Sequence, residues 1–195
     1  MFKMMKKKSN KWLVIPMVLM IFIASTTTVF AASKTLSVTQ VIQAKSNWCW
    51  AACSEMVGKY QNSSSTRDQW SVVNYVKNST SYPNNGGTDA ELVKGIRYAS
   101  SDTVTYQYSS SPLSFASHQT NIDGSNPLVV WMKWSPTSAH VVVCAGYKTT
   151  TTNNYLYLVD PIEDTTKAYY DYAHLKNGTS IQSGTGTYDH TIYKK

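Results

Sequence analysis

Residues 43–60 read QAKSNWCWAACSEMVGKY, and the rest of the chain can be interpreted outward from this stretch. Its apolar residues Ala52, Met56 and Tyr60 stand four positions apart, with further small and apolar residues beside them. This spacing is typical of a helix with one buried face. The pattern therefore predicts a helix that begins at Cys49 and ends near Tyr60.

Cys49 stands at the N-terminal end of this predicted helix, a position that affects the reactivity of its thiol. A cysteine attacks as its thiolate, and the partial positive charge of a helix N-terminus stabilises an anion. Gln43 lies six residues earlier, and a side-chain amide can donate a hydrogen bond to the oxyanion that forms when a thiolate adds to a carbonyl. The stretch thus indicates Cys49 as a nucleophile and Gln43 as an oxyanion donor.

A nucleophile of this kind needs a base, and residues 138–147 (SAHVVVCAGY) offer His140 at the start of an apolar strand. Residues 155–161 (YLYLVDP) predict another strand, which ends at Asp160. Because Pro161 disfavours helical geometry at the residue before it, we expect Asp160 to leave the strand in an extended conformation. Its carboxylate would then accept a hydrogen bond from the imidazole and fix the orientation of the ring.

These segments resemble the papain-like cysteine peptidases. The resemblance rests on Gln43, five residues, then Cys49-Trp50-Ala51, on His140 followed by branched apolar residues and Gly-Tyr, and on Asp160 as the third residue. Aspartate in the third place is similar to compact bacterial branches, the bacteriocin-leader-processing peptidases and certain secreted effector peptidases. The resemblance implies a papain-like fold, a peptide or protein substrate, hydrolysis through a thioacyl-enzyme by Cys49, His140 and Asp160 with Gln43 as oxyanion donor, and no cofactor.

Residues 1–31 predict a secretory signal peptide. They have a basic start, an apolar run over 12–24 that is interrupted by Pro16, and small residues that favour cleavage after Ala31. The run is shorter than the roughly 18 apolar residues that a membrane span needs. We therefore expect a secreted, extracellular protein with no stable membrane association after cleavage, in which residues 32–195 form one papain-like peptidase domain.

The net charge argues against nucleic acid as a partner. Of the 18 basic residues, 5 are lysines within residues 1–31, whereas all 11 acidic residues lie beyond them. Residues 32–195 therefore have 13 basic and 11 acidic side chains and a formal charge of +2. Such a balance gives little attraction to a polyanion, so we expect no nucleic-acid partner. We also expect a monomer.

The chain has three cysteines, an odd number for an exported protein, which indicates a free reactive thiol or an intermolecular partner. Cys53 lies one helical turn after Cys49, and Cys144 lies on the predicted strand of His140. If the helix packs on that strand, the sulfur atoms of Cys53 and Cys144 lie close together. A disulfide and a pair of buried free thiols both stay open.

The first hundred residues favour helices and the remainder favours strands. Thr66 or Asp68 caps a second helix that ends near Lys77, and the capping box of Thr88 and Glu91 opens a third that ends near Ala99. Further along we expect strands over 103–108, 127–134, 140–148, 155–159 and 185–193, the last of which closes the sheet, a short helix over 114–121, and either a strand or a helix over 168–175. This order predicts an α+β fold with a helical half packed against an antiparallel sheet and a cleft between them.

The other histidines, His118, His174 and His190, stand in polar surroundings, so we expect them at the surface. Asp164 is the main rival of Asp160 as the third residue. A zinc site is disfavoured because the cysteine pair in the first helix has no matching Cys/His pair downstream. A serine hydrolase is disfavoured because no serine lies in a glycine-flanked turn.

Two other functions stay open beside peptide hydrolysis. The same thiolate and oxyanion site would serve a cell-wall peptide amidase or an acyltransferase. A non-catalytic binding module on a peptidase fold is also compatible with the 14 tyrosines and the low charge.

Overall fold

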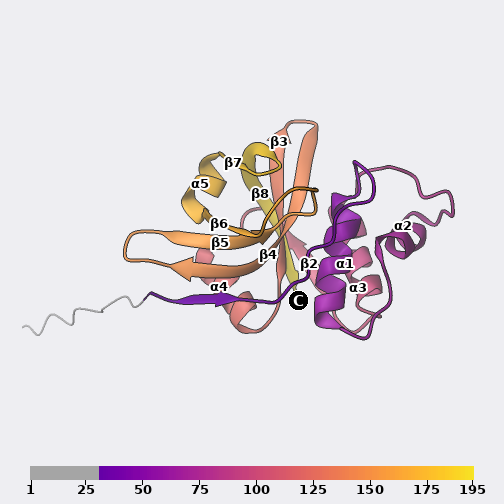
Figure 1. The fold of residues 1–195 in the computed structure, drawn as a ribbon, viewed down its shortest axis with the longest axis horizontal. Helices are drawn as coiled ribbons and strands as arrows, with labels where there is room; N and C mark the ends of the chain where they lie inside the picture. The colour runs from indigo at the N-terminus through magenta and orange to yellow at the C-terminus, as the bar shows by residue number, and fades with distance from the viewer. Residues whose placement is uncertain (1–30) are drawn as a thin grey trace, which may run out of the picture.

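The structure, a computed structural model, describes residues 31–195 (Figure 1). The predicted signal peptide, apart from its last residue, lies outside the described residues. The chain forms a helical half and a sheet half, which Figure 1 shows side by side, and this confirms the expected α+β architecture. The helical half contains α1 (Cys49–Gln61), α2 (Gln69–Lys77) and α3 (Asp89–Ala99).

The helices α2 and α3 begin where their caps predict. The side chain of Asp68 accepts a hydrogen bond from the N–H of Ser71 at the start of α2. Thr88 and Glu91 form the predicted capping box at the start of α3, each satisfying the free backbone N–H of the other. The first helix, α1, packs against α2, α3 and the sheet, so all its residues from Trp50 to Gly58 are buried.

The strands are β1 (Ser33–Thr35), β2 (Tyr106–Ser109), β3 (Leu128–Ser135), β4 (Ser138–Thr149), β5 (Asn154–Val159), β6 (Ala168–Asp171), β7 (Thr179–Ile181) and β8 (Gly184–Lys194). They form an antiparallel sheet with the order β2-β8-β3-β4-β5-β6. A short strand, β1, pairs with the last part of β4, and β7 pairs with β8. Two helices, α4 (Phe115–Asp123) and α5 (Tyr172–Asn177), pack on the sheet.

The pairing of β4 with β5 brings two distant parts of the sequence together. Val143 of β4 lies opposite Val159, the last residue of β5. Because the two strands are antiparallel, the end of β5 lies beside the beginning of β4. His140 and Asp160 therefore lie at the same end of these two strands, where α1 packs against β4.

The structure decides one open alternative about the sheet and corrects one expectation. The segment 168–175 contains both a strand and a helix, since Asp171 ends β6 and caps α5 by accepting from the N–H of His174. The last strand, β8, lies inside the sheet between β2 and β3 and does not close it. Across residues 31–195, no helix has the length and apolar character to cross a membrane.

Candidate active site

Cys49 is the first residue of α1 and is half-buried. The first N–H groups of an α-helix have no partner within the helix, and the helix dipole makes this end attractive to negative charge. The thiol and the backbone N–H of Cys49 therefore belong to a part of the fold that favours an anion. This is the position that the sequence predicted for the nucleophile.

The two tryptophans beside Cys49 hold a loop against the start of α1. The indole N–H of Trp48 donates to the carbonyl of Pro83 at 3.0 Å, and that of Trp50 donates to the carbonyl of Asn85 at 3.1 Å. The backbone N–H of Asn47 adds a bond to the side-chain oxygen of Asn84 at 3.0 Å. The loop over 82–87 is thus fixed beside the nucleophile and forms one wall of a cleft.

His140 is the third residue of β4 and is 3% exposed. Its Nε2 lies 2.8 Å from Oδ1 of Asp160. An ionised carboxylate only accepts hydrogen bonds, so Nε2 donates, and Nδ1 is the nitrogen left for another partner. The same carboxylate oxygen accepts from the N–H of Ile162 at 3.0 Å, and the carbonyl of Asp160 accepts from the side chain of Gln40 at 2.8 Å.

A cleft of about 190 Å³ lies between the two halves, with Cys49, His140 and Gln43 in its lining. Asp160 lies behind His140 and is 6% exposed. Asp164, the rival candidate, is exposed. The remaining lining residues are Ser46, Asn47, Trp50, Gly86, Gly87, Trp131, Trp134, Ser138, Ala139, Val141 and Ile162.

The environment of His140 favours its protonated form. Burial alone lowers the pKa of the imidazole, but the hydrogen bonds and negative charges of Asp160 and Cys49 outweigh burial and raise the pKa from 6.5 to about 9. Burial also raises the pKa of the Asp160 carboxyl, but its bonds to His140 and to the N–H of Ile162 lower it below the usual value. The arrangement thus favours a protonated imidazole whose Nε2 donates to Asp160.

All three cysteines lie in the described part of the chain, and each of them is a free thiol. Cys53 and Cys144 are fully buried, which decides the open alternative in favour of buried thiols. Burial raises the pKa of Cys53 well above its usual value, with a further contribution from the charge of Cys49, and raises the pKa of Cys144 to about 12. Both therefore stay protonated at neutral pH. Cys53 donates to the carbonyl of Val141 at 3.3 Å and so connects α1 to the strand of His140.

Gln43 lies in the lining of the cleft, but its amide is already engaged. Nε2 donates to the carbonyls of Lys45 at 3.0 Å and Ser46 at 2.9 Å, both in the turn that leads to Cys49. The Oε1 atom is buried and has no hydrogen-bond partner within the described structure. For this side chain to donate a hydrogen bond to an oxyanion, its Nε2 must release one of these two carbonyls and bond the oxyanion instead.

One aromatic neighbour of His140 carried no signal in the sequence. The indole of Trp134, on β3, stacks on the imidazole with ring centroids 5.1 Å apart and planes 22° apart. The contact covers one face of the ring and limits its rotation. The contact between Trp134 and His140 depends on the register of β3 against β4, which sequence periodicity alone does not predict.

The expectation for the other histidines was wrong for His118. This residue is fully buried, where its Nε2 bonds the hydroxyl of Tyr188 at 3.0 Å. His190 is half-buried between the carboxylates of Asp89 and Asp189, each 2.7 Å away, whereas His174 is exposed as expected. Within residues 31–195, no group of three or more His, Cys, Asp or Glu side chains is arranged to hold a metal ion.

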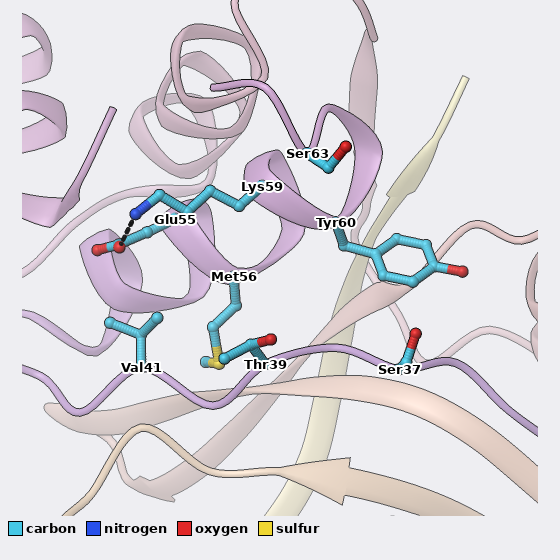
Figure 2. Close-up of a pocket in the computed structure, with 8 residues that line it drawn as sticks. All are labelled: Ser37, Thr39, Val41, Glu55, Met56, Lys59, Tyr60 and Ser63. Atoms are coloured by element: carbon cyan, nitrogen blue, oxygen red, sulfur yellow. Dashed lines mark hydrogen bonds and ion pairs between the residues drawn. The ribbon is translucent and has the colours of Figure 1, made fainter. Parts of the chain in front are cut away.

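A larger pocket of about 440 Å³ lies between α1 and the segment 37–41 (Figure 2). Its walls are the segment 37–41 and the side chains of Glu55, Met56, Lys59 and Tyr60. Cys49 and His140 line the smaller cleft instead, so the chemistry and not the volume identifies the candidate active site.

Comparison with known protein families gives one match over most of the chain. Residues 35–185 match the family described as the Peptidase_C39 like family. The matched region contains Gln43, Cys49, His140 and Asp160. No curated protein sequence matches the chain.

Solved structures of papain-like proteins share the fold. A C39-like peptidase from Bacillus anthracis has a TM-score of 0.59 at 13% identity, and the match covers 84% of this chain and 98% of that one. A structure from a study of the mite allergens Blo t 1 and Der p 1 gives 0.55 at 13% identity, covering 89% of this chain and 73% of that one. Digestive procathepsin L 3 of Tenebrio molitor gives 0.55 at 14% identity, covering 87% and 71%. At these identities the likeness concerns the fold.

Proposed function

Because this chain belongs to the Peptidase_C39 like family of cysteine peptidases, we propose that it hydrolyses peptide bonds with Cys49 as nucleophile, His140 as acid and base, and Asp160 as the orienting group. The observation that carries the proposal is the bond of 2.8 Å between His140 Nε2 and Asp160 Oδ1, because His140 lines the same cleft as Cys49. This bond leaves Nδ1 of His140 for the thiol.

The reaction begins with the thiolate of Cys49 and the imidazolium of His140. The sulfur attacks the scissile carbonyl carbon, and the carbonyl electron pair moves to the oxygen. The backbone N–H of Cys49 and the side-chain amide of Gln43 stabilise this oxyanion, the latter after exchange of one of its carbonyl acceptors. As the tetrahedral species collapses, the C–N bond breaks, and the proton on Nδ1 of His140 passes to the leaving amine.

A water molecule then completes the cycle. His140 accepts a proton from the water as the oxygen attacks the thioester carbon, and the C–S bond breaks to release the acid product and restore the thiolate. Asp160 accepts from Nε2 throughout and stabilises each imidazolium that forms. The atoms and charges balance with peptide and water as the reactants.

The lining of the cleft also bears on the substrate. Its tryptophans are Trp50, Trp131 and Trp134, and among the described residues that line it there is no Lys, Arg, Asp or Glu. Burying an unpaired charge against such walls is costly. The proposed enzyme therefore favours uncharged side chains next to the scissile bond.

The test is hydrolysis of casein and of a denatured proteome digest, with the products sequenced by mass spectrometry. Cys49→Ala should abolish hydrolysis. Cys53→Ala is the matched control, because it removes a buried thiol one turn away and should leave cleavage at the same sites. Equal activity of Cys49→Ala and the unchanged protein would refute the proposal.

We also propose that the protein is exported and cut after Ala31, as the composition of residues 1–31 suggests. The measurement is the N-terminal sequence of protein recovered from the culture medium, which should start at Ala32. Recovery of the chain only inside the cell with its first residues intact would contradict export.

A further inference from the structure

A buried side chain of the helical half holds the segment that carries Gln43. Gln69 is the first residue of α2 and is 6% exposed. Its Nε2 donates to the carbonyl of Ile42 at 2.8 Å, and its Oε1 accepts from the N–H of Ala44 at 2.8 Å. This one side chain therefore fixes the peptide groups on both sides of Gln43.

The sheet half holds the same segment from the other direction. The N–H of Gln43 donates to the carbonyl of Pro161 at 2.8 Å. Pro161 directly follows Asp160, whose carboxylate is bonded to His140. Gln43 is thus bonded as a residue of a strand would be, with the amide of Gln69 on one side and the loop after β5 on the other.

Glu55 of α1 fixes Gln69 in turn. One carboxylate oxygen accepts the backbone N–H of Gln69 at 2.7 Å, and the other accepts from Lys59 at 2.6 Å. The first N–H groups of a helix need outside acceptors, and Glu55 provides one for α2. Figure 2 shows Glu55 and Lys59 together on α1, with Val41 on the facing segment. A continuous series of hydrogen bonds, each buried or partly buried, therefore leads from the nucleophile helix to the segment of Gln43.

We propose that Gln69 is a positioning residue for the oxyanion donor Gln43, and this inference rests on the function proposed above. An oxyanion donor is effective only where it is held at the point at which charge develops. Both polar atoms of the Gln69 side chain form hydrogen bonds with the backbone of the two neighbours of Gln43. It fixes where the Gln43 amide meets the cleft without touching the substrate.

Gln61, at the end of α1, provides a matched control. Its amide also joins distant segments, donating to the hydroxyl of Tyr106 at 3.2 Å and to the carbonyl of Ser125 at 3.3 Å. These partners lie outside the segment of Gln43. Gln61→Met therefore removes a half-buried amide that joins distant segments while leaving the bonds at Ile42 and Ala44 intact.

The experiment compares kcat, KM, urea unfolding and the rate of Cys49 alkylation by iodoacetamide in Gln69→Met, Gln61→Met, Gln43→Ala and the double variant Gln43→Ala/Gln69→Met. Loss of one oxyanion donor lowers kcat by about 100- to 1,000-fold, so its displacement in Gln69→Met should lower kcat by about tenfold or more with KM nearly unchanged. Alkylation needs no oxyanion site and should keep its rate. In the double variant, Gln69→Met should add no further loss of kcat to that of Gln43→Ala.

Other outcomes separate this inference from the proposed function. An unchanged kcat in Gln69→Met, a loss no larger than that in Gln61→Met, or additive losses in the double variant would overturn the positioning role alone. If the unchanged protein shows no hydrolysis that depends on Cys49, both the positioning role of Gln69 and the proposed function are overturned. If Gln69→Met does not fold, Gln69→Asn keeps an amide that is one methylene too short for both bonds, and it should show the same selective loss of kcat.

Discussion

A β-carbon added to Gly87 would lie 2.4 Å from Cγ of Trp50, so the backbone of Gly87 rests directly on the indole ring. Trp50 in turn donates to the carbonyl of Asn85. The loop is therefore bonded and packed against the first turn of the helix that begins at Cys49. The neighbouring Gly86 is different, because a β-carbon there would have no described atom within 4 Å.

Gly87→Ala should therefore destabilise the protein, and Gly86→Ala should not. Forcing an atom into the contact with Trp50 moves the ring or the loop, and overpacking of this kind costs about 1–3 kcal/mol. Urea unfolding measures the free energy, and hydrolysis of casein should fall in Gly87→Ala as the cleft wall shifts. Gly86→Ala makes the same change in the unfolded chain and is the control; equal losses in the two variants would contradict the close contact.

Asp160→Ala should shift the alkaline limb of the pH profile to lower pH. The carboxylate of Asp160 helps to raise the pKa of His140 to about 9, so its removal lowers that pKa, and the imidazolium is lost earlier as the pH rises. The value of kcat should also fall by about 100-fold, because the ring loses its orienting partner. The measurement is kcat/KM on one peptide from pH 5 to pH 10.

Asp160→Asn separates the loss of the negative charge from the loss of the hydrogen-bond acceptor. The amide keeps an oxygen acceptor for Nε2 of His140 but removes the negative charge. It should retain more of kcat than Asp160→Ala while its alkaline limb still moves to lower pH. An alkaline limb that stays in place in both variants would show that Asp160 does not set the protonation of His140.

His118 should make the fold sensitive to acid. Burial lowers its pKa from 6.5 to about 4, although its bond to the carbonyl of Ser114 partly opposes this. The unfolded chain therefore binds a proton near pH 6.5, whereas the folded chain does not. The contribution of His118 to the free energy of unfolding is complete above pH 6.5 and falls between pH 6.5 and 4, by at most about 1.4 kcal/mol per pH unit.

Urea unfolding at pH 7.5, 5.5 and 4.5 checks this prediction. His118→Gln removes the titrating ring, so its stability should decrease less from pH 7.5 to 4.5 than that of the unchanged protein. The same substitution at the exposed His174 is the control and should keep the original acid dependence. Identical pH dependence in all three proteins would be inconsistent with a neutral buried His118.

Local patterns in the sequence predicted the helical half well. The spacing of Met56 and Tyr60 and the capping box of Thr88 and Glu91 are determined by neighbours in the chain, and α1 and α3 follow them closely. The expected meeting of His140 and Asp160 depends on the pairing of β4 with β5, which a short hairpin imposes. The catalytic roles of Cys49, His140, Asp160 and Gln43 stay predictions.

Long-range contacts explain what the sequence did not predict. His118 was expected at the surface because its neighbours are polar, yet it lies four residues before the buried Ile122 on one face of α4. That spacing was a usable signal. Gln69 had no such signal, because its partners Ile42 and Ala44 become neighbours only when α2 docks beside α1.

The division of the site between the two halves has a consequence for the cell that makes the protein. Ribosomes produce the sulfur of Cys49 91 residues before the imidazole of His140. The strand of His140 pairs with β3, which is made just before it, and β3 pairs on its other side with β8, the last strand of the sheet. We therefore expect the thiol of a nascent chain to lack its proposed partner His140 through most of synthesis, and the sheet that holds this histidine to be complete only after the final strand has been made.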